Sequence, residues 1–304
     1  MDSGRTPTTV AVVSTFHPEN VLLENCKALM AQCVGVIVVD DGSSAPDEDV
    51  FTAVERLGCT VLRLRTNAGI AAALNRGIEL ARRSYPNLKY ILTMDQDSFV
   101  EPGFVRRLVD AASSADALGM KVGMIAPGTV SGLPSRARRT QSTVVIGDEP
   151  VQSGLLIPVS CLDEIGLFNE ELFIDGVDSE FYLRAKAKGL QSIIAPLASL
   201  THSLGSMVPA RLGPWAIRWR GKPLLIRIAA SWRYYFIVRN RLVLCRRYAV
   251  AEPKWVIRGF LGDVRHILLV TLLAPGRQER LEAAARGFSD GVHGRTGPMP
   301  AKNL

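Results

Sequence analysis

The first hundred residues alternate between strand-like and helix-like patterns, and this alternation limits the fold more than any other feature of the chain. Runs rich in valine and isoleucine occur at 9–16, 34–43, 59–65 and 89–97. Apolar residues recur between them at helical spacing, around 21–29, 50–57 and 70–81. Strands that alternate with helices predict an α/β fold with a mostly parallel sheet flanked by helices on both faces. Ligands of such sheets bind beyond the carboxyl ends of the strands.

The pattern changes near residue 122. Strands punctuated by glycine and proline follow, then a helix over 178–188 and one more strand that ends at His202. Beyond Pro209 the composition is basic and aromatic, and it indicates helices. We therefore expect one α/β domain at 1–205, with halves at 8–100 and 101–205. A basic aromatic helical region should follow at 206–290, and a loose tail at 291–304.

Composition indicates a globular chain with a real core, because 47% of its residues are hydrophobic and 21% are charged. The five cysteines are odd in number and scattered, and none forms a CxxC pair, so we expect reduced thiols and neither a disulfide framework nor a zinc site. The first residues lead into a strand pattern without the apolar run of a signal peptide. The expected location is therefore the cytoplasm.

Positive charge is concentrated in one segment. Between His202 and Glu252 there are ten basic residues and no acid, so of the net charge of +7 the rest of the chain contributes −3. The longest uncharged apolar run beyond His202, "HILLVTLLA" at 266–274, is far shorter than the roughly 20 residues that a spanning helix needs. Arginine, lysine and tryptophan mixed with leucine suit an amphipathic surface on anionic lipid. Helices packed on the α/β domain, or a nucleic-acid patch, would have a similar composition.

Acids follow two of the predicted strands, in "VDDGSS" and "MDQDS". Neither a GxGxxG fingerprint nor a P-loop is present, and acids can hold a phosphate only through a hard divalent cation. Alternate residues of an extended segment point the same way, so Asp95 and Asp97 can face one ligand with Gln96 turned aside. The alternative is that these aspartates cap the helix that follows, where Pro102 could start it.

A second acidic group stands at the predicted entry of the helix over 178–188. Asp175, Asp178 and Glu180 lie where the helix dipole favours an ionised carboxylate, as a general base requires. His202, at the end of the next strand, could add an imidazole ligand that tolerates manganese as well as magnesium. The alternative is structural, with Glu180 and Arg184 forming an ordinary i,i+4 ion pair.

Together these stretches resemble the inverting GT-A-fold glycosyltransferases of family 2, most of all the bacterial rhamnosyltransferase branch. The similarity covers roughly residues 8–250, and the order and spacing of the motifs carry it. The motifs are "STFHPE", "VIVVDDGSS", "NAGIAAALNRGI", "LTMDQDS", "SGLLIPVSCLDEIGLFNEELFIDGVDSEFYLRAKAKG" and "THSLG". The halves 8–100 and 101–205 would then bind the nucleotide sugar and the acceptor.

The resemblance also implies roles for residues of the first half. Thr15 and Phe16 would line the pocket for the nucleotide base, and Asp41 would accept a hydrogen bond from the pyrimidine N–H. Asn67 would hold the nucleotide sugar and the first phosphate, and we expect it also to cap the helix that begins near residue 70. Asp95 would contact the ribose side.

For the reaction itself the resemblance implies a metal and a base. Asp97 and His202 would bind Mg²⁺ or Mn²⁺ on the diphosphate, and Asp178 would deprotonate the acceptor hydroxyl. Where many relatives carry an aromatic residue and an acid just before the base, this chain has Gly176 and Val177. The acceptor contacts at this point should therefore differ from those of the relatives.

The implied activity is inverting transfer of L-rhamnose from dTDP-L-rhamnose to a polysaccharide or O-antigen precursor. The acceptor would be a glycan or a polyprenyl-diphosphate-linked sugar, met at the inner face of the cell membrane, with no nucleic acid expected as a partner. A UDP-sugar donor is one alternative, and a non-catalytic nucleotide- or nucleic-acid-binding module is another. A sugar nucleotidyltransferase would need a glycine-rich basic first loop, which "STFHPEN" lacks.

Overall fold

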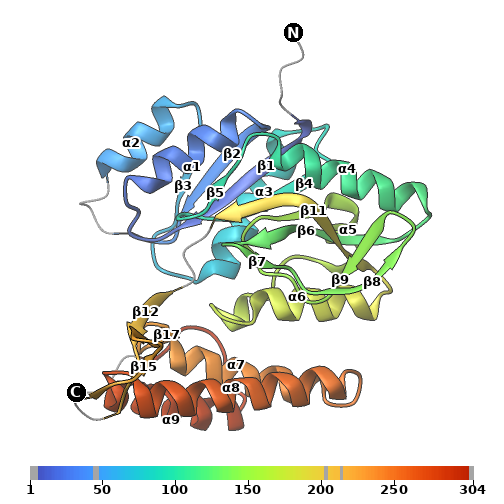
Figure 1. Ribbon diagram of the computed structural model, residues 1–304. Coiled ribbons are helices and arrows are strands. Elements are labelled where there is room, and N and C mark those ends of the chain that lie inside the picture. Colours follow the sequence, from blue (N-terminus) through green and yellow to red (C-terminus); the bar gives the residue numbers. More distant parts are fainter. Residues whose placement is uncertain (1–5, 44–47, 202–204, 213–214, 301–304) are drawn as a thin grey trace. The chain divides into compact units, whose positions relative to one another are not determined.

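The computed structural model describes residues 6–43, 48–201, 205–212 and 215–300. The chain divides into two compact units (Figure 1). The first comprises residues 1–170 and 177–203, and the second comprises residues 171–176 and 204–304. The short segment 171–176 therefore groups with the C-terminal part of the chain, which sequence analysis had not separated.

The N-terminal half of the first unit is a parallel sheet, as the alternating pattern predicts. Its strands lie in the order β3-β2-β1-β4. Three helices connect them in chain order. The elements are β1 (Thr6–Thr15), α1 (Val21–Met30), β2 (Cys33–Asp40), α2 (Glu48–Arg56), β3 (Thr60–Arg63), α3 (Ile70–Ser84) and β4 (Tyr90–Asp95).

The same sheet continues as a mixed sheet, which has eleven strands within the described residues. Strand β10 is antiparallel to both of its neighbours, β4 and β6, while β11 is parallel to β6. The remaining strands extend or flank this half. The elements are β5 (Phe99–Val100), α4 (Phe104–Ala117), β6 (Val122–Val130), β7 (Leu133–Pro134), β8 (Ala137–Gln141), β9 (Val144–Gly147), β10 (Leu155–Pro158), α5 (Val159–Ile165), α6 (Val177–Ala187) and β11 (Gln191–Thr201).

Both faces of the sheet are covered, which explains the unbroken apolar runs of its strands. Ala11 and Val13 belong to one buried cluster with residues of α1, α2 and α4. On the opposite face of β1, Val12 lies so close to α3 that a Cβ on Gly77 would come within 2.3 Å of it. The expected α/β architecture, a mostly parallel sheet with helices on both faces, is thus confirmed, with its core on both sides of one sheet.

Strand directions decide which residues can meet. Because β10 is antiparallel to both β4 and β6, strands β1, β2, β3, β4, β6 and β11 all run the same way. Their carboxyl ends therefore share one edge of the sheet, with Thr15 paired to Asp40 and Ser14 to Asp95. Helix α6 precedes β11 and contacts it, so it runs back across the sheet and begins at that same edge.

In its described part, the second unit combines small hairpins with three helices. Strand β12 (Ser206–Pro209) pairs with β17 (Leu225–Ile228), and two hairpins lie between them in the chain. These are β13 (Arg211–Leu212) with β14 (Trp215–Ala216) and β15 (Arg218–Trp219) with β16 (Lys222–Pro223). The helices are α7 (Arg233–Tyr248), α8 (Pro253–Leu273) and α9 (Arg277–Val292).

The helical pattern predicted beyond Pro209 was wrong for the first part of this unit, because helices begin only at Arg233. The physical reason lies in the turns. Arg220 (φ 50°) and Gly221 (φ 78°) both have positive φ, the conformation that joins two twisted strands through a two-residue turn. Within the described residues, no helix is long and apolar enough to cross a membrane.

The end of the chain is not loose over residues 293–300. The main-chain N–H of Gly297 donates to the carbonyl of Glu171 at 2.7 Å, and the guanidinium of Arg239 donates to the carbonyl of Gly297. Arg286 donates to the carbonyl of Pro300 at 2.7 Å. A buried arginine and a loop carbonyl thus hold this segment within the second unit, which composition alone does not reveal.

Candidate active site

The ends of β1 and β4 are joined by the side chain of Gln96. Its Oε1 accepts hydrogen bonds from Thr15 Oγ1 at 2.6 Å and from the main-chain N–H of Phe16 at 2.8 Å. The ring of Phe16 is 42% exposed at this edge of the sheet. The prediction that Gln96 turns aside was therefore incomplete, because Gln96 fixes the segment that carries the two residues expected at the base pocket.

Asp41 organises the loop that precedes α3. Its two carboxylate oxygens accept hydrogen bonds from the main-chain N–H groups of Ala68 at 2.7 Å and Gly69 at 2.9 Å. Burial raises the pKa of Asp41, and the two N–H donors oppose that shift. The predicted contact with a pyrimidine ring stays a prediction, and the hydrogen bonds add a structural role.

Gly42 allows this loop to approach the end of β2. It has φ +81°, and a Cβ at this position would lie 2.6 Å from the carbonyl carbon of Thr66. Asn67 is exposed beside it. The expectation that Asn67 caps α3 was wrong, because the N-cap position is Gly69 and no side chain caps it there. Asp41 holds the loop just before this helix, and Asn67 keeps only its predicted ligand role.

The segment that contains Asp95 and Asp97 is held from two sides. Asn25 of α1 donates to the carbonyl of Asp95 at 3.1 Å, and the N–H of Asp95 donates to Ser153 Oγ at 3.0 Å. Both carboxylates are partly exposed. The helix-cap alternative is not what the structure has, because α4 begins after Gly103 with no side-chain capping hydrogen bond.

Asp178 lies in the first turn of α6, at the same edge of the sheet. It is partly exposed, and its Oδ1 accepts the N–H of Ser179 at 2.8 Å. The hydroxyl of Ser179 donates to Glu149, an acid that sequence analysis missed. Glu180 is buried and pairs with Arg184 at 2.9 Å, so the structural interpretation of Glu180 is confirmed.

The loop directly before this helix has a strained backbone. Phe173 (φ 65°) and Asp175 (φ 62°) adopt the left-handed conformation that non-glycine residues avoid, and Gly176 follows at φ 84°. Arg233 of α7 binds the carboxylate of Asp175, with Nε 3.2 Å from Oδ2. The ring of Phe173 stacks on Phe236, with 5.0 Å between centroids.

Two adjacent residues of α7 satisfy the carbonyls of this loop. Asn240 Nδ2 donates to the carbonyls of Leu172, Ile174 and Asp175 at 2.8, 2.7 and 2.7 Å. Arg239 is fully buried and also donates to Leu172 O, at 2.9 Å. In the sequence both residues look like members of a basic surface stretch, so their burial could not be foreseen. We call residues 171–176 the base loop, because they lead directly to Asp178.

The described residues contain no group of three or more histidines, cysteines, aspartates or glutamates that could hold a metal. His202, the expected second metal ligand, lies outside the described residues. A site of this kind does not need three protein ligands, because Mg²⁺ is usually held by one or two carboxylates together with substrate phosphates. Asp97, partly exposed at the sheet edge, fits that description.

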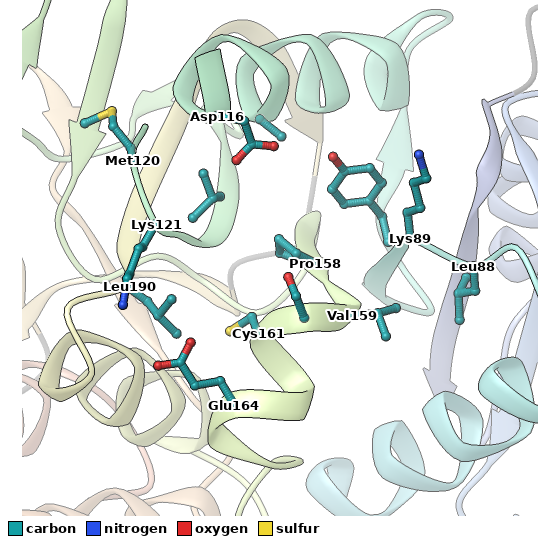
Figure 2. A pocket seen from close by; sticks show the side chains of 14 residues that line it. Leu88, Lys89, Asp116, Met120, Lys121, Pro158, Val159, Cys161, Glu164 and Leu190 are labelled. Atoms are coloured by element: carbon teal, nitrogen blue, oxygen red, sulfur yellow. The ribbon is translucent and has the colours of Figure 1, made fainter. Parts of the chain in front are cut away.

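A cavity of about 520 Å³ lies elsewhere in the first unit (Figure 2). It is lined by the first residues of β4 and β6 and by the start of α5, so it opens at the amino ends of the parallel strands. Burial raises the pKa of the Cys161 thiol in its wall to about 12, so this thiol stays protonated at neutral pH and is a poor nucleophile. We therefore place the chemistry at the opposite edge.

Comparison with known proteins agrees with this geometry. Residues 10–160 match the family model described as glycosyl transferase family 2. The chain is a family 2 glycosyltransferase. It is similar to the dTDP-rhamnosyl transferase RfbF of Shigella flexneri, at 26% identity over 94% of this chain and 96% of that protein.

A second relative shares only part of this glycosyltransferase. The succinoglycan biosynthesis protein ExoO of Rhizobium meliloti (strain 1021) is 28% identical over 37% of this chain and 32% of its own length. Among solved structures, GalNAc-T7 with UDP, GalNAc and Mn²⁺ superposes with a TM-score of 0.59 at 12% identity. That match covers 94% of this chain and 56% of the other, and it supports the fold alone.

Proposed function

We propose that this glycosyltransferase moves L-rhamnose from dTDP-L-rhamnose to a glycan acceptor with inversion at the anomeric carbon. The observation that supports dTDP-L-rhamnose as the donor is the similarity to the dTDP-rhamnosyl transferase. This similarity extends over both units and nearly the whole of that protein. The edge of the sheet supplies matching chemistry, because aromatic, acidic and amide side chains gather at the strand ends where a nucleotide sugar binds.

Asp178 is the proposed general base. An acceptor hydroxyl is a weak nucleophile, and removal of its proton in the transition state contributes about 10²- to 10⁴-fold to the rate. Asp178 takes the proton, the acceptor oxygen bonds to the anomeric carbon, and the bond from that carbon to the diphosphate oxygen breaks with its electron pair on the diphosphate. Attack opposite the leaving group converts a β-linked donor into an α-L-rhamnoside.

Thr15, Phe16, Asp41, Asn67 and Asp95 are the proposed nucleotide-sugar contacts. Gln96 and Asp41 hold two of the segments concerned through main-chain N–H groups, so the pocket is largely formed before the donor arrives. Asp97 is the proposed ligand of a divalent cation, joined by His202. A bound Mg²⁺ or Mn²⁺ would neutralise charge on the departing diphosphate.

We also propose that the acceptor is a polysaccharide or O-antigen precursor, glycan-linked or polyprenyl-diphosphate-linked, used at the inner face of the cell membrane. One feature supports this acceptor and another supports this location. The relative ExoO is named for the biosynthesis of a polysaccharide. Residues 204–304 carry 18 lysines and arginines against five acids, a net charge of +13, whereas residues 1–203 carry −6.

The proposed donor is tested by calorimetry on the purified chain, with dTDP, UDP and GDP, each with Mn²⁺ and with chelator. We expect tight binding of dTDP that requires the metal and is lost in Asp97→Ala. Preference for UDP would retain the mechanism and replace the donor with a UDP-sugar. Failure of all three nucleotides to bind, with or without metal, would contradict the proposal and favour a non-catalytic binding module.

A further inference from the structure

Helix α8 exposes an apolar face that is unusual for a helix of a soluble domain. Seven of its large apolar side chains are 39% to 60% exposed. Five of them follow at intervals of four, three, four and four residues, which places them on one side of a helix with 3.6 residues per turn. The seven are Ile257, Phe260, Leu261, Val264, Leu268, Leu269 and Leu272.

The charges that α8 itself places beside this face are all positive. Lys254, Arg258 and Arg265 are exposed, and at roughly 100° per residue they lie along one flank of the apolar stripe. The single acid of α8 is Asp263, which points to the opposite side and accepts a hydrogen bond from Arg241 Nε of α7 at 2.6 Å. The exposed face of α8 therefore combines apolar and basic side chains without any acid.

Exposed aromatic residues extend this surface. Strand β13 contacts α8, and its hairpin partner β14 carries Trp215, which is 77% exposed. Trp219 of the next hairpin is 72% exposed and follows Arg218. Tryptophan is typical of the interface between lipid headgroups and acyl chains, where its ring is partly buried and its N–H stays hydrated.

We propose that the exposed face of α8 lies flat in the interface of an anionic lipid bilayer, with its leucines among the acyl chains and its basic residues at the headgroups. No described helix is long and apolar enough to span a membrane, so a helix that lies on the surface fits the observations. A second copy of the chain is a poorer fit, because a two-fold contact would bring together two basic faces that offer no acid to pair with.

This inference deepens the location given under the proposed function by naming the surface, and it does not depend on the donor sugar. The test is flotation of the purified full-length chain with vesicles of phosphatidylcholine alone and of phosphatidylcholine with an equal amount of phosphatidylglycerol. We expect the wild-type chain to float with the anionic vesicles only, and to float less as salt is added, because salt screens the basic flank.

Two sets of variants localise the contact. Leu261→Glu with Leu268→Glu should weaken vesicle partitioning about a hundredfold or more. Each change removes a leucine that would insert among the acyl chains, and it adds a negative charge near anionic lipid. Lys254→Gln with Arg265→Gln should weaken it about tenfold. The matched control is Leu133→Glu with Leu197→Glu, two exposed leucines of the first unit, which should float like the wild type.

Three readouts separate the outcomes. The α8 variants should match the wild type in thermal unfolding and in calorimetric binding of dTDP. An error in the proposed donor and an error in the proposed membrane surface are therefore detected by different measurements. Equal flotation of Leu261→Glu/Leu268→Glu and wild type, or no flotation of the wild type with anionic vesicles, would overturn the proposal. A wild-type dimer in light scattering that this pair of changes converts to a monomer would assign the face to a second copy instead.

Discussion

Single side chains in this protein hold backbone segments at the site as well as offering groups to a ligand. Gln96 joins the ends of β1 and β4, and Asp41, directly after β2, holds the loop that precedes α3. Both contacts link residues that are far apart in sequence. A substitution at either position should therefore act on the shape of the nucleotide pocket, even where the substituted atom does not touch the donor.

The proposed base gives the sharpest prediction at this scale. In Asp178→Asn the acceptor hydroxyl loses its proton acceptor, so the rate of transfer should fall about 10²- to 10⁴-fold. Calorimetric affinity for dTDP should not change, because Asp178 acts on the acceptor. Asp110→Asn, which alters an exposed acid on α4, is the matched control. Comparable rates in Asp178→Asn and wild type would remove Asp178 from the mechanism.

A second prediction concerns acid stability. A hydrogen bond from Tyr235, at 2.7 Å, and the ion pair with Arg295, at 2.9 Å, hold the pKa of Asp290 below its ordinary value of 3.8. A carboxyl with a lowered folded-state pKa adds stability above its unfolded pKa and loses it as the pH falls through the folded value.

Thermal unfolding measured across a range of pH tests whether ionised Asp290 stabilises the fold. Asp290→Asn should melt at a lower temperature than the wild type at pH 7, and the gap should persist down to the ordinary pKa of 3.8 and then close. A gap that stays constant or widens in stronger acid would show that Asp290 does not contribute as an ionised group.

At the scale of elements, α7 decides the conformation of the base loop. Helices usually contribute an apolar stripe to a core, but α7 also contributes Arg239 and Asn240, both buried. Their donors satisfy carbonyls of a loop whose backbone is strained at Phe173 and Asp175. Such strain persists only where the surroundings impose it, so α7 acts as the support for the residues just before Asp178.

Replacement of Asn240 by aspartate tests this support, because it keeps the size of the side chain and removes the two N–H groups that the three carbonyls share. We expect about 1–3 kcal/mol lower stability, as buried carbonyls lose their partner. The rate of transfer should fall while dTDP affinity stays the same, since the base loop leads to Asp178 and not to the nucleotide pocket. Asn87→Asp, an exposed substitution of the same kind, is the control, and an unchanged rate in Asn240→Asp would contradict the role.

At the scale of the whole molecule, the base loop should make transfer activity depend on the folding of the second unit. All four tryptophans lie in residues 204–304, so tryptophan fluorescence reports the unfolding of that unit alone. Because residues 171–176 belong to the same unit, its unfolding should release the base loop. In a urea titration, transfer activity should therefore be lost no later than the tryptophan signal changes. Activity that outlasts the fluorescence transition would show that the first unit catalyses the reaction by itself.

The sequence by itself determined the sheet, the strands that lead to Asp41, Asp95 and Asp97, and the helix whose first turn holds Asp178. These follow from local periodicity, which depends only on residues close together in the sequence. It misjudged the start of the second unit, where short strands and the two-residue turn at Arg220 and Gly221, and not apolar spacing, set the structure. It also treated Asn67 as a cap, but the N-cap position of α3 is Gly69, and the loop before it is held by Asp41 from another part of the chain, which leaves no local signal.

Only the tertiary structure decided which polar residues work inside the protein. Arg239, Asn240 and Gln96 are polar residues in polar stretches, and nothing local distinguishes them from surface residues. Each makes a hydrogen bond to a residue more than sixty positions away, with Arg239 and Asn240 reaching Leu172 and Gln96 reaching Thr15. Such contacts depend on how elements pack, because a buried carbonyl must find its donor wherever the fold brings one.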